Sequence, residues 1–179
     1  MHIRWHPLLA TGSGAQHSEE RRVHLLSVLF VAQSFFGTLP IDGIRCDRAE
    51  GDVEHLHVNL QLFDRGRSVP VPSGVGIPQG GYCLYWLHTH SADGFIHIES
   101  PVKRSFDLGE FFDIWGPDLS LTKSATLSAP RGHHLLIWVD GKPWHGSDPR
   151  TIAFHDHQTI VIQNGPPFAT PARSDWSKL

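Results

Sequence analysis

From about residue 40 onward, hydrophobic and polar positions alternate in short runs, which is the pattern of β-strands with one buried face. The clearest run covers residues 55–62, where Leu and Val side chains occupy the even positions. The odd positions are polar and begin with His55 and His57. This run predicts a strand that carries two histidines on its polar side.

A second histidine-bearing unit is predicted as a β-hairpin. Residues 82–90 form one strand, residues 91–94 (Ser-Ala-Asp-Gly) a tight turn, and residues 95–99 the returning strand. A four-residue loop would pair position 88 with 97, whereas a two-residue Asp-Gly turn would pair 90 with 97. Because these registers differ by two residues, both place the same side chains on one face, and Cys83 on the other. The shared face carries His88, His90, His97 and Glu99.

The remaining patterns complete a mainly β domain. Residues 105–116 combine a Ser cap, apolar positions at helical spacing and a final Gly, so one short helix is expected there. Prolines restrict residues 68–72 to an edge strand or an extended connection. Residues 135–139, followed by an Asp-Gly turn, and residues 152–162 predict a further hairpin and strands. The expected fold is a small antiparallel barrel or sandwich with one short helix.

Residues 1–39 are expected to form a leader. Two arginines precede the apolar run of residues 25–32, and Ala32 and Ser34 offer a small-x-small cleavage pattern. These features predict a signal peptide or an N-terminal anchor, and therefore a secreted, periplasmic or membrane-anchored protein. The alternative interpretation is an ordinary core helix, because the run is shorter than the roughly 20 apolar residues that span a bilayer.

Composition indicates that residues 40–179 form a single histidine-rich globular domain. The chain has 179 residues, of which 40% are hydrophobic, and a net charge of −3 at pH 7. That charge provides no basic field for nucleic acid, and we expect no nucleic-acid partner. Histidine is unusually abundant, with 14 residues against 15 for Lys and Arg together. Imidazole is the commonest metal ligand in proteins, so a metal ion is the expected partner.

Cys46 and Cys83 are the two cysteines, and they lack the CxxC spacing of thiolate zinc sites. Their even number suits one disulfide. Such a bond would close a loop of roughly 40 residues and add about 3–4 kcal/mol of stability in an oxidising compartment. Two buried free thiols are the alternative.

The hairpin histidines form the predicted metal site. Two histidines at positions i and i+2 of a strand project to the same side, and a third from the paired strand completes a set around one ion. We therefore predict His88, His90 and His97 as ligands, with His57 and His55 as additional ligands from a neighbouring strand.

The type of ligand narrows the choice of metal. Imidazole without thiolate favours Zn²⁺ or Cu²⁺ over Ca²⁺ or Mg²⁺, which prefer oxygen ligands. A blue-copper centre needs a Cys ligand and usually an axial Met, whereas Cys83 faces away and the one methionine is Met1. Iron or manganese is less expected, since cupin-like motifs place Glu three or four residues after the second His, and Glu99 lies nine residues after His90.

The other histidines lie near turns or strand ends and are interpreted mainly as surface residues. They include His133, His134 and His145. The sequence His155-Asp156-His157 is a minor candidate for a second metal site.

Three segments of the chain carry a resemblance: Cys83-Leu-Tyr-Trp-Leu-His88-Thr-His90, Gly94-Phe-Ile-His97-Ile-Glu99-Ser-Pro101 and Phe111-Phe-Asp-Ile-Trp-Gly116. They are similar to the signature of a family of uncharacterised bacterial and archaeal proteins, which usually have an N-terminal signal or anchor. The resemblance covers about residues 41–165 and implies a disulfide between Cys46 and Cys83. Family members tend to carry a third alternating histidine where this chain has Asn59, so no ligand is implied there.

The leading functional hypothesis is an extracytoplasmic protein that binds Zn²⁺ or Cu²⁺ through the hairpin histidines. A first alternative is an enzyme with a three-histidine centre and an open coordination position, in which Glu99 accepts or relays a proton in a hydrolase or lyase step. A cupin-like oxygenase is a variant of this alternative. The second alternative is an interaction module that the metal only stiffens.

Overall fold

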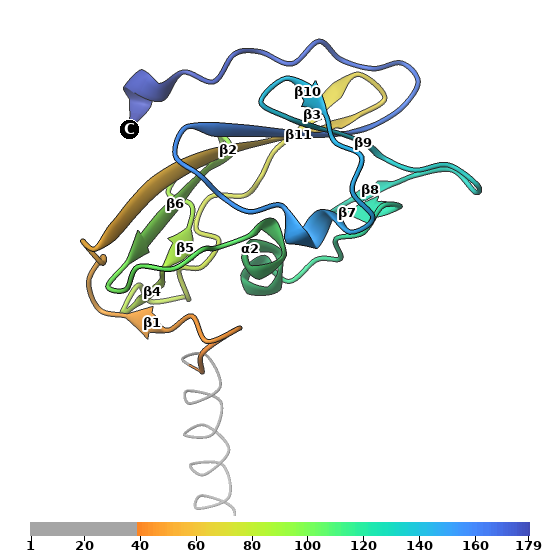
Figure 1. Ribbon diagram of the computed structural model, residues 1–179. Coiled ribbons are helices and arrows are strands. Elements are labelled where there is room, and N and C mark those ends of the chain that lie inside the picture. The colour runs from red at the N-terminus through yellow and green to blue at the C-terminus, as the bar shows by residue number, and fades with distance from the viewer. Residues whose placement is uncertain (1–38) are drawn as a thin grey trace, which may run out of the picture. The chain divides into compact units, whose positions relative to one another are not determined.

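A computed structural model describes residues 39–179 of the protein (Figure 1). The leader predicted for residues 1–39 therefore lies outside the described residues, except for Leu39. Among the residues that the structure describes, no helix has the length and apolar character needed to cross a membrane.

A seven-stranded sheet is the frame of the domain (Figure 1). Its strands run in the spatial order β10 (Lys142–Pro143), β9 (Leu136–Val139), β11 (Gln158–Asn164), β2 (Glu54–Asp64), β6 (Phe95–Ser100) and β5 (Leu87–His88), and β3 (Arg67–Val69) also pairs with β2. The other described strands form two small pairs, β1 (Cys46–Asp47) with β4 (Leu84–Tyr85) and β7 (Lys123–Ser124) with β8 (Leu127–Ser128). Two short 3-10 helices, η1 (Pro149–Thr151) and η2 (Trp176–Lys178), lie near the C-terminal end.

The expected fold class is confirmed, since the described domain is mainly β with one α-helix. Its strands do not close into a barrel. The central pairing differs from a wholly antiparallel sheet, because β11 lies parallel to β2 while β6 lies antiparallel to it. Parallel neighbours require a long crossover, and here the chain between β2 and β11 passes through the helix.

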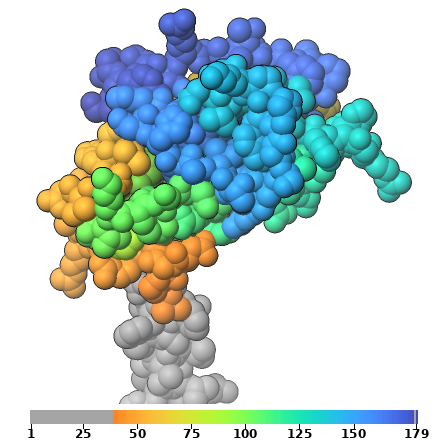
Figure 2. Space-filling view, in the orientation of Figure 1, coloured from red at the N-terminus to blue at the C-terminus, as the bar shows by residue number. Residues whose placement is uncertain are grey.

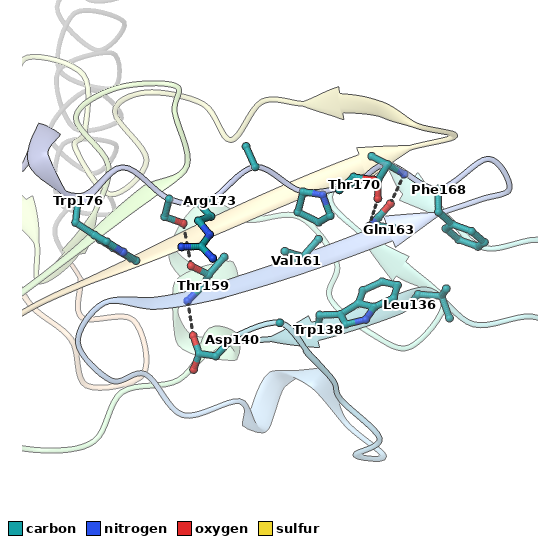
Figure 3. A pocket seen from close by; sticks show the side chains of 15 residues that line it. Leu136, Trp138, Asp140, Thr159, Val161, Gln163, Phe168, Thr170, Arg173 and Trp176 are labelled. Carbon is teal, nitrogen blue, oxygen red and sulfur yellow. Dashed lines mark hydrogen bonds between the residues drawn. The ribbon is translucent and has the colours of Figure 1, made fainter.

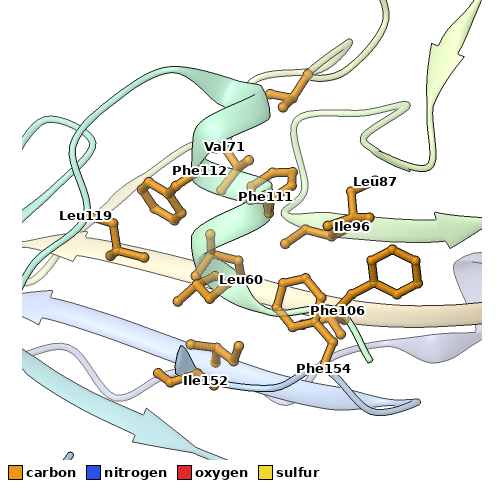
Figure 4. Close-up of a cluster of buried hydrophobic side chains, with 14 of the residues drawn as sticks. Leu60, Val71, Leu87, Ile96, Phe106, Phe111, Phe112, Leu119, Ile152 and Phe154 are labelled. Atoms are coloured by element: carbon orange, nitrogen blue, oxygen red, sulfur yellow. The ribbon is translucent and has the colours of Figure 1, made fainter. Parts of the chain in front are cut away.

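One face of the sheet forms the hydrophobic core. The predicted alternation of β2 is confirmed, and its even positions join those of β6 and β11 in an apolar layer that is at most 1% exposed: Val58, Leu60, Leu62, Ile96, Ile98, Ile160 and Ile162. Helix α2 (Leu108–Trp115) packs on this layer through Phe111 and Phe112, which are fully buried (Figure 4). The strands are therefore held rigidly from one side.

Helix α2 begins later than the sequence pattern indicated. Asp107 is its N-cap instead of Ser105, because the Asp107 carboxylate accepts a hydrogen bond from the backbone N–H of Glu110 at 2.9 Å. The Glu110 carboxylate in turn accepts from the backbone N–H of Asp107 at 3.1 Å, which completes a capping box. The helix ends at Gly116, as expected, in a left-handed conformation.

The predicted hairpin strand of residues 82–90 is divided into two parts. Leu84–Tyr85 pair with β1, whereas Leu87–His88 pair with β6. The division follows from the disulfide between Cys46 and Cys83, which holds β1 beside β4. The second part pairs His88 with His97, which is the register of the four-residue loop.

The opposite face of the sheet is polar, and the C-terminal segment, residues 165–176, crosses it. The Gln61 amide donates to the carbonyl of Ala172 at 3.0 Å, and the Ser174 hydroxyl donates to Asn59 at 3.0 Å. In Figure 1 the C-terminal segment and α2 lie on opposite sides of the sheet. In Figure 2 the dark blue residues of this segment cover the top of the domain.

The predicted disulfide is confirmed in the structure, and we expect it in the isolated protein. A bond across 37 positions should contribute about 4 kcal/mol by restricting the unfolded chain. Mass spectrometry of non-reduced protein treated with an alkylating reagent should show neither cysteine modified. Alkylation of both thiols without prior reduction would contradict the expectation.

The packing of α2 on the sheet predicts how much stability is lost when one of its core side chains is removed. Phe111→Ala should lower the free energy of unfolding by about 3–5 kcal/mol, because it leaves a cavity between helix and sheet. Phe168→Ala, at a position that is 48% exposed, is the control and should cost less than about 1 kcal/mol. Urea unfolding of both variants measures the difference, and similar losses would argue against the observed packing.

Candidate metal centre

Five histidines and one glutamate meet at one end of the polar sheet face. His97 on β6 lies opposite His57 on β2 and also opposite His88 on β5, so three imidazoles form one row across three strands. In the adjacent row of the sheet, His55 lies opposite Glu99. Since opposite residues of paired strands lie about 4.5–5.5 Å apart, these side chains are direct neighbours. His90 joins them from the residues just after β5.

His88 is fully buried, and its ring orientation is fixed by the backbone. Its Nδ1 lies 2.9 Å from the carbonyl oxygen of Tyr85, and because a carbonyl can only accept, Nδ1 is the protonated nitrogen. Burial lowers the pKa of His88 to about 4, so the ring is neutral at physiological pH. Its Nε2 therefore presents a lone pair to its surroundings, which is the arrangement of a metal-ligating histidine.

Glu99 lies on the middle strand and is only 4% exposed. Its Oε1 lies 3.5 Å from Nε2 of His55 and 3.5 Å from Nδ1 of His97, and its Oε2 lies 3.6 Å from Nε2 of His88. Burial raises the pKa of Glu99, but the neighbouring imidazoles, His97 foremost, outweigh it and hold that pKa below its usual value. The side chain is therefore a buried carboxylate.

One oxygen of this carboxylate has no hydrogen-bond partner among the described residues. Oε2 of Glu99 is buried and forms no hydrogen bond within the part of the chain that the structure describes. A buried charged oxygen without a partner is costly, and such atoms are rare in folded proteins. A cation bound between Oε2 and the lone pair of His88 would remove this cost.

The ligand atoms fall into two groups that share Glu99. We call Glu50, His88, His90 and Glu99 the inner site, and His55, His57 and Glu99 the outer site; within each, the ligand atoms lie within 4.8 Å of one another. The Nε2 atoms of His88 and His90 are 3.2 Å apart, as are those of His55 and His57. Tetrahedral zinc with bonds of 2.0–2.1 Å requires ligand atoms about 3.3–3.4 Å apart. Both histidine pairs are close to that spacing.

His97 belongs to neither group, although the sequence predicted it as a ligand. Its ring lies between the others, with centroids 4.8 Å from that of His57 and 4.6 Å from that of His90. Its Nδ1 faces Oε1 of Glu99. His97 thus contacts the carboxylate that belongs to both groups.

Glu50 was not predicted from the sequence. Its Oε1 lies 3.9 Å from Nε2 of His90, and its side chain is 56% exposed. The loop that carries it runs directly along β6, because the backbone N–H of Gly51 donates to the carbonyl of Glu99 and a Cβ at Gly51 would overlap Ser100. Nothing in the local sequence pattern marks Glu50, since its position depends on this long-range contact.

Comparisons with known proteins assign no function to this centre. The chain matches no protein-family model, no curated protein and no solved structure. The function therefore has to be inferred from the side chains themselves.

The loop of residues 72–77 supports the His-x-His segment of residues 88–90 through contacts with Thr89. Thr89, between His88 and His90, is fully buried, and its hydroxyl donates to the carbonyl of Pro72 at 2.7 Å. Its backbone N–H donates to the carbonyl of Val75 at 3.0 Å. The central residue of the His-x-His motif is thus an anchor that fixes both flanking imidazoles.

The minor candidate at His155-Asp156-His157 does not assemble into a site. Nε2 of His155 lies 3.1 Å from a carboxylate oxygen of Asp140, while the His157 ring packs against Trp176. Among the described residues, neither histidine belongs to a group of three close ligand atoms. This segment instead supports the outer site, because the Asp156 carboxylate accepts a hydrogen bond from the backbone N–H of His57 at 3.1 Å.

A groove of about 860 Å³ lies on the same polar face, between the C-terminal segment and strands β9 and β11 (Figure 3). Trp138, Val161 and Phe168 provide much of its apolar lining, and Trp176 stands at one end. The groove contains none of the histidines of the metal centre.

Gly76 provides a test of how the loop positions His88. A Cβ at Gly76 would lie 2.4 Å from the carbonyl oxygen of Leu87 and 3.1 Å from Cβ of His88, whereas a Cβ at Gly74 would meet no atom within 4 Å. Both glycines have φ of +74°, so an alanine at either position carries the same backbone strain. Gly76→Ala should therefore displace His88 and weaken Zn²⁺ binding by about 10–100-fold, the usual effect of disturbing the support of a ligand.

Gly74→Ala is the matched control and should bind Zn²⁺ like the wild type. Competition with a chromophoric chelator measures both affinities, and circular dichroism checks that both variants fold. Equal affinities in the two variants would show that the contact with Gly76 does not position His88.

Proposed function

We propose that the protein is an exported metal-binding protein that takes Zn²⁺ or Cu²⁺ at the inner site. The observation that carries the proposal is the buried carboxylate of Glu99, whose Oε2 has no hydrogen-bond partner within the described residues and faces the Nε2 lone pair of His88. Two electron-rich atoms facing each other in a buried position repel unless a cation lies between them.

The geometry of the inner site fits a small ion with imidazole ligands. Nε2 of His88 is 3.2 Å from Nε2 of His90 and 3.6 Å from Oε2 of Glu99, close to the edges of a tetrahedron about zinc. Glu50 can supply a fourth ligand after a small movement, because its side chain is exposed and 3.9 Å from His90. Two imidazoles with two carboxylates suit Zn²⁺ or Cu²⁺ better than ions that take oxygen ligands alone.

Export is supported by the disulfide between Cys46 and Cys83, since such bonds persist mainly in oxidising compartments. The basic and apolar leader pattern of residues 21–34 and the resemblance to a family of exported or membrane-anchored proteins agree with this location. Together these features support a location outside the cytoplasm.

A metal-dependent enzyme is the second candidate, and partial exposure of the ligands favours it. The side chains of His90 and Glu50 are 48% and 56% exposed, so an ion at the inner site is accessible to solvent. Catalytic zinc keeps a coordination position open to solvent, whereas structural zinc is closed by four protein ligands. In this function Glu99 would be a ligand and not the proton acceptor expected from the sequence, and Glu50 would remain uncoordinated and could accept a proton from water at the site.

Substitution of the inner-site ligands tests the proposal. His88→Ala and His90→Ala should each weaken Zn²⁺ or Cu²⁺ binding more than tenfold, because loss of a ligand outweighs even the 10–100-fold effect of a supporting residue. His97→Ala should also weaken metal binding, because His97 contacts the carboxylate of Glu99. Isothermal titration calorimetry measures the affinities.

His145→Ala removes an exposed imidazole far from the centre in the sequence and should leave binding unchanged. His90 is exposed and thus replaceable without disturbing the core, so the His90→Ala result stands even if His88→Ala fails to fold. Wild-type affinity in His90→Ala and a correctly folded His88→Ala would overturn the proposal.

A further inference from the structure

The two oxygens of Glu99 serve different histidine pairs. Oε1 faces His55, and Oε2 faces His88, at 3.5 and 3.6 Å respectively. This division follows from the sheet order, because β6 lies between β2 and β5. A carboxylate on the middle strand is therefore within reach of ligands from both neighbours.

One ion cannot use all of these ligands. With bonds of 2.0–2.1 Å, atoms bound to the same ion lie at most about 4.2 Å apart. The ligand atoms of the inner and outer sites form two separate close groups, and Glu99 is their common member. Each group also has its own histidine pair, with 3.2 Å between the Nε2 atoms.

The backbone of the outer histidine pair is also held in place by neighbouring segments. His57 is paired with His97 in the sheet, its backbone N–H donates to the Asp156 carboxylate, and its carbonyl accepts from the backbone N–H of His157 at 2.9 Å. His55 lies two residues earlier on the same face of β2, where its side chain remains 56% exposed. The backbone of His57 is thus held in place and its ring contacts the rings of His55 and His97, while His55 is open to solvent.

We infer that the centre holds two divalent transition-metal ions, one at the inner and one at the outer site, with Glu99 as the bridging carboxylate. This inference rests on the proposed metal-binding function and extends it from one ion to two. Carboxylate-bridged ions lie about 3.5–4 Å apart, the separation found in two-metal hydrolytic sites. His97, beside Oε1, keeps the bridge in the orientation that serves both ions.

Metal stoichiometry of the full chain tests the inference. The wild-type protein, saturated with Zn²⁺ and freed of excess ion, should contain two ions per chain by plasma emission spectrometry. The double variant His55→Ala/His57→Ala should contain one, because the inner site remains. The matched control His133→Ala/His134→Ala also removes two imidazoles, both exposed and outside either site, and should still contain two.

The bridge is tested separately by loading the protein with Cu²⁺. Two Cu²⁺ ions bridged by a carboxylate couple magnetically, so the wild type should show a half-field transition in electron paramagnetic resonance and a loss of integrated intensity. Both features should disappear in Glu99→Gln and in His55→Ala/His57→Ala. The latter should retain the signal of a single Cu²⁺.

The possible outcomes separate this inference from the proposed function. One ion per chain in the wild type, or two ions in the folded His55→Ala/His57→Ala variant, would overturn the two-ion centre and leave metal binding at the inner site intact. Two ions without magnetic coupling would overturn the bridge by Glu99. No bound ion in the wild type would overturn both proposals.

Discussion

The carboxylate of Glu99, buried on the middle of three strands, is the constraint on which this end of the molecule depends. A negative charge that is 4% exposed is costly unless positive or hydrogen-bonding groups surround it. The groups nearest to it are imidazoles from β2, β5 and β6 itself. The neutral ring of His88 points its Nε2 lone pair toward Oε2 and so compensates the charge poorly, whereas a cation between these two atoms would compensate it well. The sheet thus brings together side chains that could hold a metal ion around this carboxylate.

Maintaining that arrangement requires support on every side of the three strands. The apolar face is covered by α2, and Tyr85 and Thr89, which flank the edge strand β5, form backbone hydrogen bonds with the loop of residues 72–77. At the end of the sheet, the disulfide and the hydrogen bond of 2.7 Å from the Trp86 indole N–H to Asp47 hold the loop that carries Glu50. Ligands that are already in place lose little conformational entropy on binding, which is the main physical advantage of preorganised sites.

The sequence predicted which side chains share a face of their strand, because this depends only on odd or even position. It did not predict which strands lie next to one another. Alternation placed His55 with His57, and His88 with His97, on common faces whatever the turn geometry, because a register change of two residues preserves the face. Alternation could not show that β2 is the neighbour of β6, the pairing that brings the histidines of β2 to Glu99. Nor could it show that β11 lies parallel to β2. The position of Glu50 depends on the contact of its loop with β6. The start of α2 at Asp107 depends on a capping box, which replaces the Ser105 cap that the sequence pattern suggested.

The polar face of the sheet also explains why the ligand set ends at His57. The next residue on that face, Asn59, is buried, donates to the carbonyl of Asp93 at 3.2 Å and accepts from Ser174 at 3.0 Å. An amide that both donates and accepts can hold the turn and the C-terminal segment together, which a metal-bound imidazole could not do. The same segment forms one wall of the groove lined by Trp138. Because this segment contacts Asn59 next to the candidate ligands and also lines the groove, it connects the candidate metal centre with the groove within the described chain.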